Sequence, residues 1–281
     1  KEYAIKELCK LIEDISILSK IGLEEISACG LALAGVSDIN HRELLLKELD
    51  RMKISSNSII LSDTEAAFNL LCPTGMGIMI SVGTGIMCMG RDIQGNSYTV
   101  AGKGFDKDIG SGYWIGKQIL NKLILNESLV SFDTDINNLY KMTINKFNID
   151  NFESIPNVLS DENSISKIAS LSKETLLLAE EGNDTALSVV QEGTRNVADY
   201  ILFLIEKMKL NSKDIIIARN GNIIENSFYR KCLSQSLEFD FNKIHWVSSD
   251  ISPAYSAGLM AAACNKINIS IDDIIKCLKN Q

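Results

Sequence analysis

The sequence is poor in proline, histidine and aromatic residues, and it has no long apolar run. Its 281 residues include 3 Pro and 2 His, and Phe, Trp and Tyr together make up 6%. The longest apolar stretches, such as residues 76–89, are interrupted by Gly, Ser and Thr and are too short to cross a bilayer. We expect no cleavable signal, although the sequence begins at Lys1 rather than at a methionine. We therefore expect no membrane partner.

Paired cysteines are also missing. The 7 cysteines are an odd number, none forms a C-x-x-C pair, and none lies at metal-ligand spacing from either histidine. They are Cys9, Cys29, Cys72, Cys88, Cys232, Cys264 and Cys277. This pattern predicts buried free thiols in a reducing cytosol, a cytoplasmic location and no metal bound by side chains.

Positive charge is in deficit. Lys plus Arg number 28 and Asp plus Glu number 36, so the net charge of −8 has the wrong sign for a protein that binds nucleic acid by neutralising phosphates. By contrast, 46% of the residues are hydrophobic, which excludes a disordered chain. The length suits one large domain or two ordinary ones.

Apolar periodicity divides the chain into alternating helices and strands. Near the N-terminus we expect a helix over 3–19, a strand over 26–34, a helix at about 41–52, a strand over 58–61 and a helix over 63–71. Toward the C-terminus we expect a helix at about 184–209, a strand over 214–218, a helix to about 236, a strand over 243–248 and a helix over 253–264. This alternation favours an α/β fold with a largely parallel sheet and helices on its faces.

The two passages are related to each other. Gly35 precedes Asp63 by 28 residues and Gly221 precedes Asp250 by 29, and each later strand ends in Ser-Asp before an Ala-rich helix. Two related halves are therefore expected. An antiparallel meander over 77–82, 86–89 and 97–101 belongs to the second half. By symmetry, about 40 to 50 residues that form an equivalent meander are expected to be absent before the first half.

This duplication predicts the domain organisation. We expect an N-terminal domain over residues 1–74, truncated so that its first hairpin is absent. A C-terminal domain should cover residues 75–264 and carry a helical insertion at about 113–183. Residues 265–281 should form a C-terminal helix that can pack back on the N-terminal domain.

Two positions suit chemistry on a phosphate. Gly83 and Gly85 flank Thr84 in the first bend of the meander, where positive φ, backbone N–H groups and a hydroxyl can bind a phosphate, although an ordinary hairpin turn has the same residues. Asp63 follows a strand and opens a helix. It can complement the helix dipole beside a capping box, or it can accept a proton from a hydroxyl.

Two glycine-rich segments complete the set of candidates. Small residues over 102–112 precede Tyr113 and Trp114, and they predict unpaired N–H groups at a helix N-terminus where an anionic or polyhydroxyl ligand can bind. A flexible connector before a core helix is the alternative. Asn220 and Gly221 follow a strand of the second copy, where open α/β sheets bind ligands, although a plain strand-to-helix turn also explains them.

Together these segments resemble the sugar kinase, heat-shock ATPase and actin superfamily, and within it the BadF/BadG/BcrA/BcrD ATPase family, which includes N-acetylglucosamine kinases. The similarity covers nearly the whole chain, in the order LALAG, LSDTEAA, SVGTG, GSGYWIGKQIL, NGNIIEN and SPAYSAGL, and GSGYWIG is its most specific part. The resemblance implies two RNase H-like domains with a central cleft, ATP as the cofactor, and Mg²⁺ coordinated by the phosphates.

The resemblance also implies roles for single residues. Asp63 corresponds to the catalytic residue that takes the proton of the sugar hydroxyl. ATP-binding residues would be Gly83, Thr84, Gly85, Asn220 and Gly221, and substrate-binding residues would be Gly35, Asp108, Gly110 and Ser111. Sugar and ATP are the expected partners, together with a second copy of the chain in a homodimer.

The chain departs from the family pattern at several points. The N-terminal Asp-Gly-Gly-Gly-Thr phosphate loop is missing. Ile86, Lys103, Ile109 and Arg219 stand where the family commonly has Ser, Trp, Glu and a small residue. Each of these changes removes a ligand contact or adds bulk.

Three functions are compatible with these motifs. The leading hypothesis is an ATP-dependent kinase that transfers the γ-phosphate to a hydroxyl of an N-acetylated amino sugar, such as N-acetylglucosamine or N-acetylmuramic acid. An ATPase activator of a CoA-ester dehydratase or reductase is the second, but it requires cysteine thiolates for an iron–sulfur cluster, and the cysteines here lie mostly in apolar segments. A non-catalytic sugar or nucleotide sensor is the third, motivated by Ile86, Ile109 and Arg219.

Overall fold

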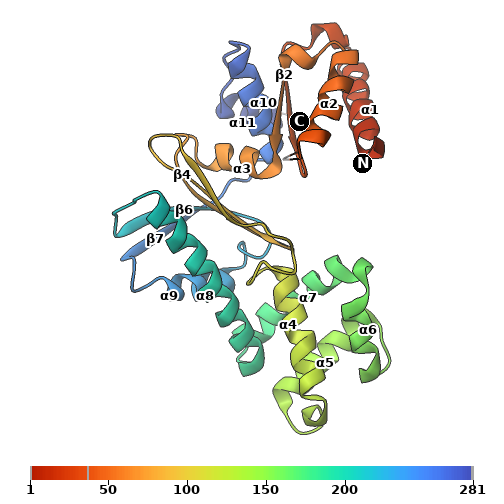
Figure 1. The fold of residues 1–281 in the computed structure, drawn as a ribbon, viewed down its shortest axis with the longest axis vertical. Helices are drawn as coiled ribbons and strands as arrows, with labels where there is room; N and C mark the ends of the chain where they lie inside the picture. The colour runs from red at the N-terminus through yellow and green to blue at the C-terminus, as the bar shows by residue number, and fades with distance from the viewer. Residues whose placement is uncertain (1, 37, 280–281) are drawn as a thin grey trace. The chain divides into compact units, whose positions relative to one another are not determined.

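The computed structural model describes residues 2–36 and 38–279. Packing divides the chain into two compact units, one made of Lys1–Pro73 with Ser249–Gln281 and the other of Thr74–Ser248. Each unit combines helices with a β-sheet (Figure 1). Among residues 2–36 and 38–279, no helix is both long and apolar enough to span a membrane.

The first unit is built on two parallel strands, β1 (Cys29–Leu33) and β2 (Ser58–Ser62). Its helices are α1 (Glu2–Ser19), α2 (Ile39–Arg51), α3 (Asp63–Leu71), α10 (Pro253–Cys264) and α11 (Ile271–Lys279), with 3-10 turns η1 (Leu23–Glu25) and η2 (Ser55–Asn57). The core joins α1, α2 and both strands through the buried side chains of Ile12, Leu31, Leu45, Leu49 and Ile60. This apolar layer holds the two strands and the loops that follow them in place.

Helix α10 belongs to this first unit, whereas the sequence predicted it as the last helix of the C-terminal domain. It packs against β1 and α3. A Cβ added to Gly30 of β1 would lie 2.1 Å from the backbone carbon of Ala257, so the strand and the Ala-rich helix approach each other through backbone atoms. The division between the units therefore falls between Ser248 and Ser249, and not at residue 264.

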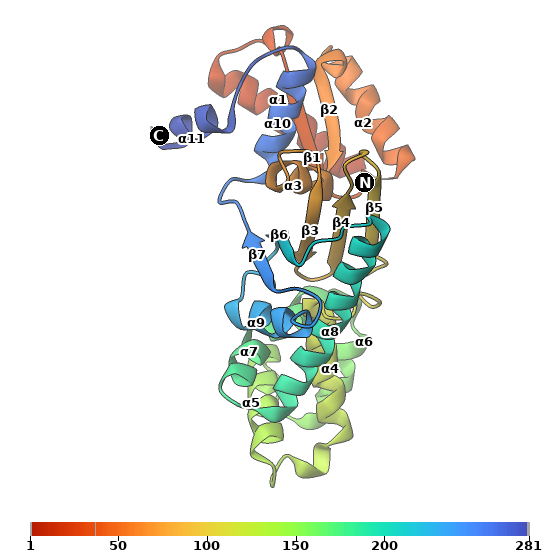
Figure 2. The ribbon, with the colours of Figure 1, turned by 90° about the vertical axis from the view of Figure 1, so that its left-hand side faces the viewer.

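The second unit contains a five-stranded sheet in the order β5-β4-β3-β6-β7 (Figure 2). The strands are β3 (Gly77–Val82), β4 (Ile86–Arg91), β5 (Ser97–Ala101), β6 (Asp214–Asn220) and β7 (Lys243–Val247). β3, β4 and β5 form the predicted antiparallel meander, and β6 and β7 join it as parallel strands. The carboxyl ends of β3, β6 and β7 therefore meet at one edge of the sheet, which is where open α/β sheets bind ligands.

Helices of the second unit cover the sheet and form the predicted helical stretch. They are α4 (Gly112–Leu125), α5 (Thr134–Phe147), α6 (Ile155–Ser160), α7 (Ile165–Glu180), α8 (Asp184–Lys207) and α9 (Ser227–Ser236), with 3-10 turns η3 (Glu127–Leu129), η4 (Phe152–Ser154) and η5 (Glu162–Ser164). α8 packs on β4, β5 and α9, while α4 packs mainly on α7. A single large apolar cluster joins these helices to the sheet, so the loops at its edge rest on a rigid base.

The geometry of the two halves agrees with the predicted duplication. Gly35 follows β1 with φ of +78° and Gly221 follows β6 with φ of +98°, and each leads into a helix and a second parallel strand. One predicted strand is shorter than expected: 26–34 becomes Cys29–Leu33, because pairing begins where Ser58 of β2 faces Cys29. Within the described part of the first unit, β1 and β2 are the only strands.

Candidate functional site

The hairpin between β3 and β4 is held tightly from its inner side. The Gly83 N–H donates to the Gly85 carbonyl at 3.0 Å, which closes the bend. The carbonyls of Gly83 and Thr84 accept the N–H groups of Gly112 at 2.8 Å and Tyr113 at 3.1 Å, which lie in the first turn of α4. The carbonyl oxygens of the bend are therefore bound by the protein itself.

These contacts correct one expectation from the sequence. We expected unpaired N–H groups at the start of α4 to bind an anionic or polyhydroxyl ligand, but they donate to protein acceptors. Gly112 and Tyr113 donate to the hairpin, Trp114 donates to the Ser111 hydroxyl at 3.1 Å, and Ile115 donates to the Ser111 carbonyl at 2.9 Å. The N-terminus of α4 thus orients the hairpin and offers no free donor of its own.

The outer side of the hairpin is different. Within residues 2–36 and 38–279, no acceptor contacts the N–H groups of Thr84 and Gly85, and Thr84 is exposed. Two adjacent N–H groups at the tip of the bend are therefore without an acceptor among the described residues. Successive backbone donors of a turn can bind anions, which fits the phosphates of ATP.

The predicted nucleotide turn lies next to this hairpin. Gly221 is so close to the strand that a Cβ there would lie 2.6 Å from the Val82 carbonyl oxygen, and the Ile223 N–H donates to that same oxygen at 3.0 Å. The Asn220 amide donates to the Ser81 hydroxyl at 3.2 Å. The structure thus brings all five predicted ATP-binding residues together at one edge of the sheet.

Arg219, the bulky departure beside this turn, is held by protein groups. Its guanidinium forms an ion pair with Glu225, and its Nη2 donates to the Ser248 hydroxyl at 3.0 Å. Burial, and then the nearby charge of Arg230, lowers the pKa of Arg219. Its Nε is buried and has no hydrogen-bond acceptor within the described residues. The side chain is therefore fixed toward the ends of β6 and β7.

Three of the four predicted sugar-side residues are buried in the second unit. Asp108 is 3% exposed, Ser111 is fully buried as the N-cap of α4, and Gly110 lies under Tyr229, whose hydroxyl donates to the Gly110 carbonyl at 2.9 Å. Burial raises the pKa of Tyr229 far above its usual range, so this donor keeps its proton. Contact of these residues with a sugar remains a prediction. The sequence carried no signal for Tyr229.

Gly35, the fourth predicted sugar-side residue, lies in the first unit. It is exposed in the loop after β1, and a Cβ there would meet no atom within 4 Å. Its carbonyl accepts the Asp38 N–H at 3.4 Å and contacts the His41 Nδ1 at 3.2 Å. The loop is therefore open at Gly35, with its carbonyl directed toward the start of α2.

Asp63 is the first residue of α3, in the first unit. The capping box forms without it: the Ser62 hydroxyl accepts the Glu65 N–H at 3.1 Å, and the Glu65 carboxylate accepts the Ser62 N–H at 2.9 Å. The Asp63 carboxylate is exposed and accepts only the N–H of its neighbour Thr64, at 2.9 Å, within the described part of the chain. Helix capping therefore does not require Asp63, and its carboxylate is available for other chemistry.

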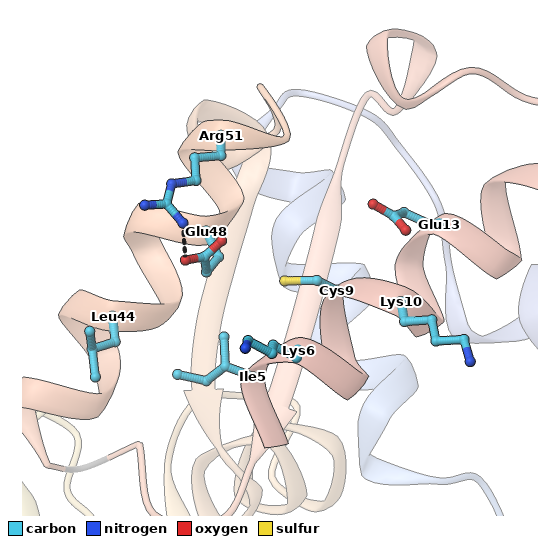
Figure 3. Close-up of a pocket in the computed structure, with 8 residues that line it drawn as sticks. All are labelled: Ile5, Lys6, Cys9, Lys10, Glu13, Leu44, Glu48 and Arg51. Carbon is cyan, nitrogen blue, oxygen red and sulfur yellow. Dashed lines mark hydrogen bonds and ion pairs between the residues drawn. The ribbon is translucent and has the colours of Figure 1, made fainter. Parts of the chain in front are cut away.

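A cavity of about 430 Å³ lies elsewhere in the first unit, between α1 and α2 (Figure 3). Its wall includes Cys9, whose pKa is raised by burial and then by the charges of Glu48 and Glu13. Glu48 is paired with Arg51 at 2.6 Å, and Lys10 points away from the space. No residue predicted from the sequence as a site residue lines this cavity.

The cysteines differ from the expectation that all are buried. Cys72, Cys88 and Cys232 are buried, but Cys264 and Cys277 are exposed. The exposed pair lies in α10 and α11, so an apolar sequence context did not imply burial. Within residues 2–36 and 38–279, no three or more His, Cys, Asp or Glu residues gather as a metal site.

Comparison with known proteins tests the family resemblance of the motifs. The sequence profile of the BadF/BadG/BcrA/BcrD ATPase family matches residues 1–262. The chain belongs to this family. Membership confirms the family expected from the motifs, and with it the expectation of an enzyme that uses ATP.

Relatives of this family member are sugar kinases by name. It is 23% identical over 265 residues to the N-acetylmuramic acid/N-acetylglucosamine kinase of Clostridium acetobutylicum, which covers 91% of this chain and 85% of that protein. A candidate N-acetylglucosamine kinase from Porphyromonas gingivalis has a similar structure, with a TM-score of 0.65 and 16% identity over 93% of this chain and 86% of the other. The ROK hexokinase of Thermus thermophilus has a TM-score of 0.54 and 12% identity over 95% and 88%. These likenesses confirm the α/β fold of the actin and sugar-kinase type.

Proposed function

We propose that this ATPase-family protein is a kinase that transfers the γ-phosphate of ATP to a hydroxyl of an N-acetylated amino sugar, of the N-acetylglucosamine or N-acetylmuramic acid class. The observation that carries the proposal is the Gly83–Gly85 hairpin, in which α4 binds the carbonyls while Thr84 is exposed and the N–H groups of Thr84 and Gly85 have no acceptor among the described residues. The sugar class is supported by the Clostridium acetobutylicum relative.

The second unit would bind the nucleotide. The N–H groups of Thr84 and Gly85 would donate to phosphate oxygens, and because protein hydrogen bonds hold the bend, little reorganisation would be needed when charge moves onto those oxygens. The Asn220–Gly221 turn at the neighbouring strand end would border the adenosine. Mg²⁺ would be carried by the phosphates and would supply charge neutralisation there.

The first unit would supply the base. In the transfer step, a sugar hydroxyl oxygen attacks the γ-phosphorus, the hydroxyl proton moves to the Asp63 carboxylate, and the bond between the γ-phosphorus and the ADP oxygen breaks. Asp63 suits this role because Ser62 and Glu65 complete the helix cap and leave its carboxylate exposed. Gly35 would allow a sugar to approach the loop that follows β1, since nothing lies within 4 Å of its missing side chain.

The test is ADP release by the full chain with Mg²⁺-ATP and N-acetylglucosamine, N-acetylmuramic acid or, as a control, glucose. Asp63→Asn should lower kcat by about 10²- to 10⁴-fold while nucleotide affinity stays the same. The matched control is Glu65→Gln, which removes a charge from the same helical turn but keeps a side chain that suits the capping box.

Two results would contradict the proposal: no phosphorylation of either N-acetylated sugar by the wild-type chain, or a kcat in Asp63→Asn close to that of Glu65→Gln. Isotope-labelled γ-phosphate recovered on the sugar, and not as free phosphate, separates a kinase from an ATPase. The expected homodimer stays a prediction, and sedimentation of the full chain tests it.

A further inference from the structure

The loop that precedes α4 is fixed by two other helices of the second unit. At Gly110 the backbone has φ of +95°, and a Cβ there would lie 2.5 Å from the Gly193 carbonyl oxygen of α8. The Tyr229 hydroxyl of α9 donates to the Gly110 carbonyl at 2.9 Å. The loop therefore approaches α8 through backbone atoms, and a side-chain hydrogen bond joins it to α9.

This hydrogen bond lies inside the unit. Tyr229 is 0% exposed and Gly110 is buried as well. A buried carbonyl that loses its donor keeps the cost of its lost hydration until it finds another partner, so the backbone around it tends to shift. The hydroxyl of Tyr229 is for this reason a constraint on the peptide group between Gly110 and Ser111.

The helix that carries Tyr229 is itself well anchored. Tyr229 lies in the first turn of α9, where its N–H donates to the side chain of the N-cap residue Asn226 at 3.0 Å. Just before this cap, the Ile223 N–H donates to the Val82 carbonyl of β3 at 3.0 Å. The hydroxyl therefore reaches Gly110 from a segment that the central sheet holds in place.

The loop that receives this contact contains three of the predicted sugar-side residues. Asp108 and Ser111 flank Gly110 along the chain, and the Ser111 N–H donates to the Asp108 carbonyl at 3.2 Å. These residues thus form one compact turn, and a shift of the Gly110 peptide moves both polar side chains together. Small displacements of groups that orient a substrate are costly to binding and catalysis.

We propose that Tyr229 is a positioning residue for the sugar: its hydroxyl holds the Gly110 peptide and thereby places Asp108 and Ser111 where the loop can contact an N-acetylated amino sugar. The inference rests on the proposed function for the identity of this ligand. Tyr229 is fully buried and acts only through the loop. The Gly83–Gly85 hairpin does not depend on this hydroxyl, because the backbone N–H groups of α4 bind its carbonyls.

The first test compares Tyr229→Phe with Tyr98→Phe in the full chain. The Tyr98 hydroxyl donates to Asp92 at 3.1 Å in the turn between β4 and β5, at the end of β4 opposite to the Gly83–Gly85 bend. Both variants therefore lose one hydroxyl and its hydrogen bond, but only one of them releases the Gly110 loop.

We expect Tyr229→Phe to raise the KM for N-acetylglucosamine at saturating ATP by about three- to tenfold. Its kcat, and its affinity for Mg²⁺-ADP measured by calorimetry without sugar, should stay within about twofold of the wild type. Tyr98→Phe should keep the wild-type KM. A purely structural role of Tyr229 would give a different pattern, because a smaller folded fraction lowers kcat and leaves KM unchanged.

A second variant displaces the same loop while the Tyr229 hydroxyl stays in place. A Cβ at Gly193 would lie 2.9 Å from the Gly110 Cα, and alanine is favoured over glycine in the interior of a helix such as α8. Gly193→Ala should therefore also raise the KM for the sugar and leave the affinity for Mg²⁺-ADP unchanged.

A sugar KM in Tyr229→Phe equal to that in Tyr98→Phe overturns the proposal. If Tyr229→Phe does not fold, an unchanged sugar KM in Gly193→Ala overturns it instead. Calorimetry with N-acetylglucosamine separates this inference from the proposed function: a wild-type chain that binds the sugar but transfers no phosphate refutes the kinase alone, and the dissociation constants of the variants then replace KM. A wild-type chain that binds neither N-acetylglucosamine nor N-acetylmuramic acid refutes both.

Discussion

Two glycines of the second unit make it possible to separate backbone strain from steric conflict. Gly182 and Gly221 have nearly the same φ, +97° and +98°. A Cβ at Gly182 would meet no atom within 4 Å, whereas a Cβ at Gly221 would lie 2.6 Å from the Val82 carbonyl oxygen and 2.8 Å from the carbonyl carbon. Replacement of each by alanine therefore imposes the same angle but a different contact.

The positive φ alone lowers the free energy of unfolding by about 1–2 kcal/mol for a residue with a side chain. Alanine also reduces the conformational freedom of the unfolded chain, which offsets about 0.4–1 kcal/mol of this loss. Gly182→Ala should therefore lower the free energy of unfolding by about 1 kcal/mol. At Gly221 the new atom meets backbone of β3, which cannot rotate away, and forced overpacking adds about 1–3 kcal/mol. Gly221→Ala should lose about 2–4 kcal/mol, and each kcal/mol lowers Tm by about 2–4 °C in a unit of this size.

Urea unfolding monitored by tryptophan fluorescence measures this difference, because both tryptophans, Trp114 and Trp246, lie in the second unit. Gly221→Ala should also weaken AMP-PNP binding, since Val82 leads directly into the hairpin proposed to bind phosphate, and Gly182→Ala should leave that affinity unchanged. Equal losses of unfolding free energy in the two variants would show that the close approach of Gly221 to Val82 does not exist in solution.

Two further predictions concern buried groups of the same unit. Tyr229→Phe removes the donor to the Gly110 carbonyl and should cost about 1 kcal/mol at pH 7. Burial raises the pKa of Tyr229 in the folded state, so the stability that this residue contributes is complete below its unfolded pKa of about 10 and is lost as the pH rises further. Between pH 9 and pH 11, the free energy of unfolding measured in urea titrations should therefore fall more for the wild type than for Tyr229→Phe. Parallel pH profiles would contradict this. In iodoacetamide labelling followed by mass spectrometry, exposed Cys264 and Cys277 should react first and Cys88 only in urea, because burial raises the pKa of Cys88 and blocks access; modification of Cys88 in the folded chain would contradict its placement.

Local chemistry made several elements predictable from the sequence. Helix α3 spans Asp63–Leu71 as predicted, because Ser62 and Glu65 satisfy the first N–H groups within one helical turn. The strands Gly77–Val82 and Ser97–Ala101 also have the predicted bounds, since the glycines and polar residues of the intervening turns limit them. In each case the residues that limit the helix or strand lie within a few positions of its ends, so the sequence alone shows them.

Packing between distant segments was not predictable in this way. Helix α10 follows β7 along the chain, and its packing against β1 and α3 assigns it to the first unit. The donors at the start of α4 are a similar case, because Gly112 and Tyr113 meet acceptors in Gly83 and Thr84, which are far away in the sequence. The first N–H groups of a helix have no acceptor within the helix, and the sequence alone does not show which distant group accepts them.

The hairpin shows why GSGYWIG is more specific than GTG. A glycine pair permits the bend, but the bend binds a phosphate only if its carbonyls are turned inward. Gly112 binds one of these carbonyls, since its N–H donates to the Gly83 carbonyl oxygen. A side chain at this position would not fit, because its Cβ would lie 2.9 Å from the same oxygen. Ser111 caps the helix that presents this donor, and Asp108 takes the Ile86 N–H. The proposed phosphate site is therefore a property of two segments together, and a change in the second segment should abolish it while the GTG sequence stays intact.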